Sequence, residues 1–576
     1  MGRRFESCRA HQNSPGSRRL EIAGRGRQLP LVRMRLFFVV FLLVSPLMAQ
    51  KSAPLPADAA AMPHGLYIVA PPADDSKFSC HKFPEQCYSK HLIPALICLG
   101  PNNPPGRDGN GVPYNCTQAG AGSTIVKGAI FRVNWNAVNT ANGTYDFSLP
   151  DREAVPWIAA GKPVGFVFNP VYERNTKSLT PTWYSTPANI SSVSRSGGVL
   201  TVQTSSDMDF FPGGVATAKG LEIQIIGTRT ALDGDGTAAS NGIYTVCDHT
   251  AAGCSDPRPR TITAISSGPN VAAVRGGTVG NPMYGSQDGS TCTSGVIPIE
   301  WRPNFIRAWQ NFMKAVVNYY GSNPHISYVR FGLGVLGQSN PTSGLSDHDP
   351  NQQACQAQMV TYGFTSVAAP WPAPTDSAWS QVQAVWEGYI NTMLQYMHSL
   401  HSPKTLQVTI SPIQPSPIDL STPNLTAANA VAAGIGIGNQ GLQRNDPMNY
   451  GQGRECKGGN WCANFAKYRG QVNLELQTTG VSDPNQTNDD LRGNQGRRFR
   501  GRGPGRQPGM GTNENRTGSL ANILPFATER GVNILELYYE DWMCAFDPGW
   551  DVEPLYQDCQ RAGYPEVFAK IARQLN

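Results

Sequence analysis

The chain has 576 residues, of which only 15% are charged, with 60 glycines, 46 prolines and a formal net charge of +6. This length excludes a single minimal domain, and the composition favours long ordered loops on a rigid scaffold over a disordered chain. Much of the positive charge lies before residue 36 and within residues 492–516, so the remainder is near neutral and no nucleic-acid partner is expected.

The N-terminal region predicts an exported protein. Met34–Gln50 (MRLFFVVFLLVSPLMAQ) combines one arginine, an apolar run and a small residue, which is the pattern of a secretory signal peptide. We predict an upstream extension over residues 1–33 and a signal peptide over 34–49, cleaved near Ala49. The apolar run is too short to leave a stable membrane span, so the mature protein is expected to be secreted. The alternative is a long basic leader or an uncleaved anchor.

Cysteine usage agrees with export. Of 13 cysteines, only Cys8 precedes the signal, and the even number that follows predicts disulfide-stapled loops. Proximity in the sequence favours Cys80–Cys87, Cys98–Cys116, Cys247–Cys254, Cys456–Cys462 and Cys544–Cys559, with Cys292–Cys355 left by elimination, although sequence does not determine connectivity. No spacing matches a zinc site, and His249 is interpreted as a solvated loop histidine. Neither a metal nor a cofactor is expected.

Apolar runs and helical patterns alternate along the chain. The predicted strands are Gly65–Ala70, Ala129–Trp135, Val164–Phe168, Ser327–Leu336, Thr405–Ser411, Gly434–Asn439, Val472–Thr478 and Val532–Tyr539. They lack alternation, as strands buried on both faces do. The predicted helices include Asp151–Ala160, Phe305–Tyr320, Trp379–Met397 and Tyr564–Leu575. Eight strands with intervening helices predict an α/β fold, a (β/α)8 TIM barrel, whose weak point is the loop-like stretch 73–127 in place of a first helix.

Two stretches interrupt this rhythm. Residues 187–298 hold short β-like runs separated by turn residues, which predicts an inserted all-β module between the barrel segments 63–186 and 299–576. The module either binds carbohydrate or walls the cleft. Residues 481–517 are rich in arginine and glycine without apolar periodicity, and are predicted to be a disordered loop. The loop is either a solvated insertion or a basic lip that attracts an acidic polymer.

Residues 128–184 carry the most informative motifs. The second predicted strand leads into W-N-x-V-N-x-x-x-G-x-Y-D-F, and the third is followed by T-P-x-W. This phrasing resembles the second and third strands of retaining glycosidases with a (β/α)8 barrel, the glycoside hydrolase clan A. The resemblance covers roughly Gly65–Asn576 without the two insertions. It implies a secreted glycoside hydrolase with a carbohydrate substrate, hydrolysing O-glycosidic bonds of a poly- or oligosaccharide by a retaining mechanism.

The resemblance also implies a nucleophile. Retaining hydrolysis needs two carboxyl groups about 5–5.5 Å apart, one as nucleophile and one as acid/base. In the barrels that this chain resembles, the nucleophile is a glutamate at the end of the seventh strand, and Glu475 in VNLELQTTG matches it. The alternative is that Glu475 forms an ion pair with a barrel arginine such as Arg132. The two roles can coexist, because a nearby arginine keeps a carboxylate ionised.

The acid/base position departs from the pattern. The resemblance places it at the end of the fourth strand, where GLGVLGQSN puts Gln338, and an amide cannot donate and recover a proton at neutral pH. Three explanations stay open. Another carboxylate serves, with Glu173, Asp347 and Glu540 as the choices; the protein is a degenerate carbohydrate-binding relative; or the fourth strand is misaligned.

Polar and aromatic residues follow the predicted strands at the edge where a parallel barrel carries its active site. The expected sugar contacts are Arg132, Asn134, Trp135, Asn169, Trp183 and Trp542. Trp542 resembles the sugar-stacking platform of such barrels, and its alternative role is packing beside Cys544. Of the neighbouring Glu540 and Asp541, at most one is expected to face the cleft.

Two rival functions are kept. One is a non-catalytic, carbohydrate-binding pseudo-glycosidase on the same barrel, for which Gln338 is the argument. The other is a surface interaction protein whose contact is the arginine-rich loop. Other enzyme classes lack their motifs: no G-x-S-x-G elbow or Walker loop occurs, and GIGIGNQG at 434–441 lacks the spacing and context of a dinucleotide site.

Overall fold

The computed structural model describes the barrel and the module but not every loop. The described residues are 62–70, 125–159, 161–170, 179–227, 242–268, 270–284, 297–334, 339, 379–410, 421–442, 461–478, 482, 518–546 and 559–575. The predicted extension, the signal peptide, the stretch 73–124 and the arginine-rich residues 492–516 lie outside them.

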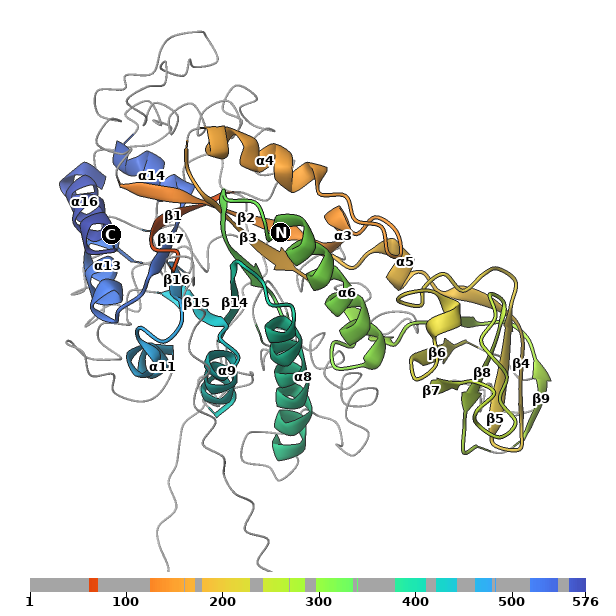
Figure 1. The fold of residues 1–576 in the computed structure, drawn as a ribbon. Helices are drawn as coiled ribbons and strands as arrows, with labels where there is room; N and C mark the ends of the chain where they lie inside the picture. Colours follow the sequence, from red (N-terminus) through yellow and green to blue (C-terminus); the bar gives the residue numbers. More distant parts are fainter. Residues whose placement is uncertain are drawn as a thin grey trace, which may run out of the picture. The chain divides into compact units, whose positions relative to one another are not determined.

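Eight parallel strands close into a barrel, which confirms the predicted fold class (Figure 1). Around the barrel they follow the order β1, β2, β3, β13, β14, β15, β16 and β17, and β17 pairs back onto β1. Their bounds are β1 Gly65–Ala70, β2 Val126–Asn134, β3 Val164–Asn169, β13 Ile326–Phe331, β14 Thr405–Thr409, β15 Gly436–Leu442, β16 Leu474–Thr478 and β17 Ile534–Tyr538. Every predicted barrel strand therefore exists in the predicted order, with ends shifted by a few residues.

Helices lie outside the strands and bury an apolar face against them. Their bounds are α3 Trp135–Val138, α4 Ser148–Ala159, α5 Thr182–Ser185, α6 Pro303–Tyr320, α8 Trp379–Ser399, α9 Ser421–Ala432, α11 Trp461–Tyr468, α13 Leu520–Glu529, α14 Tyr539–Phe546 and α16 Tyr564–Leu575. In α6, Phe305, Trp309 and Phe312 recur at helical spacing and are fully buried. Pro303 begins this helix, where its missing N–H is not needed.

Alternate residues of the barrel strands point into the barrel interior. An apolar cluster there consists of Tyr67, Val69, Ile130, Val167, Tyr328 and Ile534. The rings of Tyr67 and Tyr328 lie edge to face with centroids 5.4 Å apart. Glycine makes room for them: a Cβ at Gly128 would lie 2.8 Å from the Tyr67 ring, and one at Gly165 would lie 2.6 Å from the Tyr328 ring.

Gly438 of β15 makes room in the same way for a carboxyl group. A Cβ there would overlap Oε2 of Glu475, which is hydrogen-bonded and cannot swing aside. We expect Gly438→Ala to lower the free energy of unfolding by about 1–3 kcal/mol. The matched control is Gly388→Ala on an exposed turn of α8, where nothing lies within 4 Å of the new Cβ, and it should raise stability by up to about 1 kcal/mol. Urea denaturation of both variants checks this pair; equal effects would contradict it.

An antiparallel module is inserted between β3 and α6, as predicted. It consists of β4 Ala188–Ser196, β5 Val199–Thr204, β6 Glu222–Ile226, β7 Gly242–Cys247, β8 Thr261–Ile265, β9 Val271–Val274 and β10 Thr278–Gly280. Because β10 pairs with both β6 and β4, the sheet closes on itself and β9 is left at its edge. The β-like runs of the sequence, Val199–Thr204, Leu221–Gly227, Gly242–Val246 and Thr261–Ser266, correspond to β5–β8. The sequence patterns did not predict β4, which is rich in serine, or β9 and β10, which are very short.

The module has its own core. Phe211, Leu221 and Ile223 are fully buried in a cluster separate from that of the barrel. A short hairpin of β11 (Met283–Tyr284) and β12 (Ile297–Pro298) then leads into α6. The module therefore folds around an apolar centre of its own, within the continuous chain of the barrel.

Two of the predicted disulfides are present, Cys247–Cys254 and Cys544–Cys559. Cys462 is also disulfide-bonded, and its predicted partner Cys456 lies outside the described residues, as do the other predicted pairs. Such bonds are typical of exported proteins. Among the helices that the structure describes, none has the length and hydropathy needed to cross a bilayer.

Candidate functional site

A charged network lies in the barrel interior, between the apolar cluster and the polar ends of the strands. Nη1 of Arg330 on β13 donates to Oε2 of Glu475 at 2.5 Å and to Oε1 of Glu536 at 3.1 Å, and its Nη2 donates to Oε2 of Glu536 at 3.1 Å. The hydroxyl of Tyr328 donates to Oε1 of Glu536 at 2.7 Å. All these side chains are fully buried, so one guanidinium contacts two carboxyl groups away from bulk solvent.

This environment decides the protonation of Glu475. Burial raises the pKa of Glu475 to about 8; the Arg330 guanidinium opposes the shift, and repulsion from Glu536 adds to it. Its second oxygen, Oε1, has no hydrogen-bond partner among the described residues. Burial thus favours the protonated form of Glu475, while its contact with Arg330 favours the ionised form.

The structure thus gives Glu475 the ion-paired position that was the alternative to a nucleophile, with Arg330 in the place suggested for Arg132. Glu475 is the second residue of β16, which ends at Thr478, and its side chain has no exposed surface. A nucleophile must be ionised and must reach the substrate. In this conformation the Glu475 side chain has no surface open to a substrate, and its role as nucleophile stays a prediction.

A chain of hydrogen bonds leads from the network toward the carboxyl-terminal end of the barrel. Nη2 of Arg330 donates to Oε1 of Gln477 at 3.3 Å, and Nε2 of Gln477 donates to the hydroxyl of Tyr538 at 3.1 Å. Gln477 and Tyr538 lie two residues beyond Glu475 and Glu536, and so share their inward faces. The patterns LELQT and LELYY carried this signal, but only Glu475 was singled out in the sequence.

Inward-facing polar side chains form the mouth of the barrel, by which we mean Arg132, Asn134, Asn169, Gln477 and Tyr538. The Arg132 guanidinium lies 5.9 Å from the centroid of the Tyr538 ring. Asn134 pairs with Asn169 in the β2–β3 ladder. Oδ1 of the buried Asn169 and Nε of Arg132 have no hydrogen-bond partner among the described residues. Three of the predicted sugar contacts therefore gather here.

The three predicted tryptophan contacts lie elsewhere. Trp135 is fully buried, hydrogen-bonded to Asn139, and surrounded by aromatic rings of α6. Trp183 is half-buried and packs edge to face against Trp135. Trp542 is 2% exposed and stacks on Phe568 of α16, so its faces are not open to a sugar. These rings stabilise the packing of helices on the barrel.

The remaining catalytic predictions concern loops. Gln338, Glu173 and Asp347 lie outside the described residues. Glu540, which was predicted to follow the end of the eighth strand, lies in the first turn of α14, which begins directly after β17. Its neighbour Asp541 is buried and accepts hydrogen bonds from the backbone and hydroxyl of Ser482; burial raises its pKa to about 7.

A cavity of about 660 Å³ lies away from the mouth, between the start of α4 and the end of α6. Its lining residues are Tyr145, Asp146, Phe147, Ser148, Asp151, Ala315, Asn318 and Tyr319. Phe147 and Tyr319 stack there with centroids 4.3 Å apart. None of the predicted site residues lines this cavity, so we place the site at the mouth, where the barrel gathers them.

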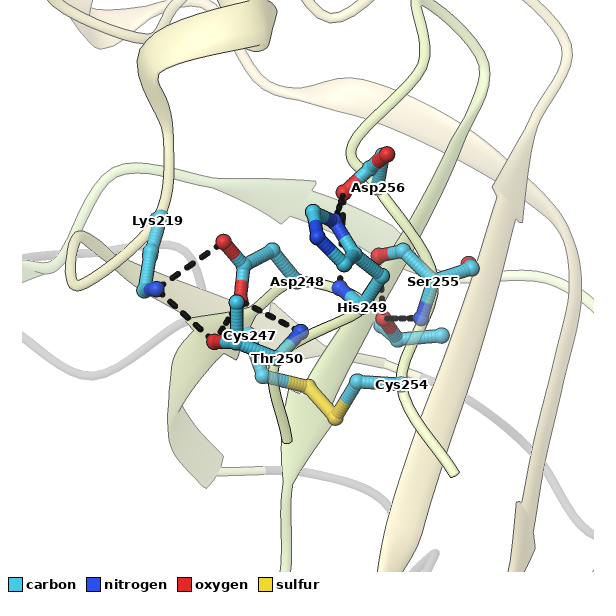
Figure 2. Close-up of a disulfide and its surroundings, with 9 residues drawn as sticks. Lys219, Cys247, Asp248, His249, Thr250, Cys254, Ser255 and Asp256 are labelled. Carbon is cyan, nitrogen blue, oxygen red and sulfur yellow. Dashed lines mark hydrogen bonds and ion pairs between the residues drawn. A yellow bond between two sulfur atoms is a disulfide. The ribbon is translucent and has the colours of Figure 1, made fainter. Parts of the chain in front are cut away.

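The disulfide loop of the module holds the one group with metal-ligand chemistry that we find among the described residues (Figure 2). Oxygen and nitrogen atoms of Asp248, His249 and Asp256 lie within 4.8 Å of one another. Nζ of Lys219 already pairs with Asp248 at 2.9 Å, and the hydrogen bond that His249 donates to Asp256 raises the pKa of His249. We therefore assign these contacts to fixing the loop beside Cys247–Cys254.

Comparisons with known proteins support no family assignment. No known protein family matches the chain, and no curated protein does. Among solved structures, the catalytic domain of a β-amylase from Paenibacillus polymyxa is 9% identical, covers 83% of this chain and 93% of that one, with a TM-score of 0.38. An exo-β-agarase is 10% identical, covers 49% of this chain and 40% of that one, with a TM-score of 0.26. These scores are low, so the fold assignment depends on the closed barrel itself.

Proposed function

We propose that the protein is a secreted glycoside hydrolase whose carbohydrate substrate binds at the mouth of the barrel. The observation that carries the proposal is the set of planar polar side chains facing inward there, with Asn169 Oδ1 and Arg132 Nε lacking described partners. Buried polar groups in native proteins are rarely left unpaired. Sugar hydroxyls both donate and accept hydrogen bonds, so a sugar can satisfy both atoms.

Catalysis requires a carboxyl group that reaches the substrate, and we assign this role to Glu540. Its backbone lies in the first turn of α14, directly after β17 ends at the mouth. Glu475, buried and hydrogen-bonded to Arg330, instead supports Arg330 and through it Gln477. A retaining mechanism needs a second carboxyl about 5–5.5 Å away, for which the sequence offers Glu173 and Asp347.

The test is hydrolysis of a panel of glycosides by the chain from Gln50 onward, beside Glu540→Gln and Glu475→Gln. Each sugar is offered with a good aryl leaving group and with a poor alkyl one. In the first step, which kcat/KM reports, an acid is needed only for the poor leaving group, where its loss lowers the rate about 10²–10⁴-fold. The same residue acts as the base in the second step, so kcat is not used for this comparison. We expect Glu540→Gln to lose activity on alkyl glycosides selectively, and Glu475→Gln to keep activity on both substrate types. Proton NMR of the first product should show that the anomeric configuration is retained.

Opposite outcomes are informative. Loss of both substrate types in Glu540→Gln would make this residue the nucleophile. Full activity in Glu540→Gln, with loss in a folded Glu475→Gln, would return the nucleophile to Glu475. Inversion at the anomeric centre would exclude the retaining mechanism.

The second candidate function is non-catalytic glycan binding on the same barrel. It is favoured by the fully buried Glu475, which is held by Arg330, and by the amide Gln338 where the resemblance places an acid/base. Glycan binding measured by calorimetry, without turnover of any aryl glycoside and without a covalent glycosyl adduct, would support this function over hydrolysis.

A further inference from the structure

Tyr538 is a mouth residue that the sequence patterns did not single out. It is the last residue of β17, and its ring packs against the apolar cluster of the barrel interior. The side chain is half-buried, so it lies between the dry interior and the open end of the barrel. The guanidinium of Arg132 lies over its ring, so the hydroxyl group is the part of the side chain that can form a hydrogen bond with a ligand.

Arg330 and Gln477, deeper in the barrel, determine the direction of hydrogen bonding at Tyr538. An arginine can only donate, so the Gln477 side-chain atom that meets Nη2 of Arg330 must be the carbonyl oxygen. The amide nitrogen of Gln477 must then face Tyr538, where it donates to the hydroxyl at 3.1 Å. This removes the usual ambiguity in the orientation of a glutamine amide. The Tyr538 oxygen is used as an acceptor, and its proton is directed to no described residue.

We infer that the Tyr538 hydroxyl donates a hydrogen bond to an oxygen of the sugar bound at the mouth, with its polarity fixed by Gln477 and Arg330. This inference rests on the proposed function, because it needs a carbohydrate at the mouth. Together with the acceptor Asn169 Oδ1 and the donor Arg132 Nε, Tyr538 would match neighbouring sugar hydroxyls. Tyr538 is thus a specificity-determining residue, and Gln477 and Arg330 are positioning residues.

The experiment uses aryl glycosides and their monodeoxy analogues, each lacking one hydroxyl, with the full mature chain. For the wild type, one monodeoxy analogue should show kcat/KM about tenfold lower than its parent, as expected when one neutral hydrogen bond is lost. Tyr538→Phe should lower kcat/KM for the parent by a similar factor. It should show no further penalty for that one analogue, while the penalties at other hydroxyls stay unchanged.

Two further variants separate recognition from folding. Tyr328→Phe removes a tyrosine hydroxyl from the buried network and should lower stability while keeping the deoxy penalties. Gln477→Glu offers Tyr538 an acceptor in place of a donor, so the tyrosine proton turns inward and the penalty should vanish as in Tyr538→Phe. A wild type that hydrolyses and binds no member of the panel overturns both this inference and the proposed function. An active wild type with Tyr538→Phe retaining every deoxy penalty overturns this inference alone.

Discussion

Replacing Arg330 with methionine is expected to lower the free energy of unfolding by about 3–5 kcal/mol at pH 7. Arg330 is the cation in hydrogen-bond contact with both Glu475 and Glu536, and all three side chains are fully buried. Methionine fills a similar length but leaves Glu536 buried without its ion-pair partner, with only the Tyr328 hydroxyl still donating to it. Urea denaturation followed by circular dichroism measures this loss.

Two comparisons show whether the loss comes from the unpaired charge. The double variant Arg330→Met with Glu536→Gln removes that charge and should recover part of the stability, because the two substitutions act on one network. Arg132→Met, at the half-buried mouth, removes an arginine without leaving a described carboxylate unpaired, and should change stability by less than about 1 kcal/mol. A loss below about 1 kcal/mol for Arg330→Met would contradict the importance of the network.

Glu475→Gln is expected to stabilise the fold relative to the wild type at pH 8 and to leave stability nearly unchanged at pH 4.5. The pKa of Glu475 is raised from 4.5 to about 8 in the folded protein, so the folded chain holds this proton more tightly than the unfolded chain does. The resulting stability is fully present below about pH 4.5 and is lost as the pH rises toward 8. The slope is about 1.4 kcal/mol per pH unit for one proton.

The measurement is the free energy of unfolding of both proteins across pH 4.5–8.5. The difference between them isolates Glu475 from carboxylates that titrate in the opposite sense. Asp541→Asn should also gain stability relative to the wild type as the pH rises, but between about pH 3.8 and 7, because burial raises the Asp541 pKa from 3.8 to about 7. Equal pH dependence in the wild type and Glu475→Gln would mean that Glu475 is ionised when folded, and would revive its assignment as nucleophile.

The local chemistry of the sequence was enough to determine the barrel. Strands buried on both faces must be apolar throughout, and parallel strands need long crossovers, so eight apolar runs with helical patterns between them led to one architecture. The disulfides Cys247–Cys254 and Cys544–Cys559, in which both cysteines are described residues, join near neighbours in the chain. Short loops make such pairings readable without tertiary information.

The tertiary structure decided which side chains meet. Alternation along a strand shows which residues point into the barrel. The stagger of the strands in the closed barrel determines which of these residues lie at the same height along the barrel axis. This is why Arg330, and not Arg132, is the partner of Glu475. Burial of Trp135 and Trp542 depends on α6 and α16, which pack over them from distant parts of the chain. The raised pKa of Glu475 results from the burial of its own side chain and from its contacts with Arg330 and Glu536 on other strands. No local sequence pattern could therefore predict it.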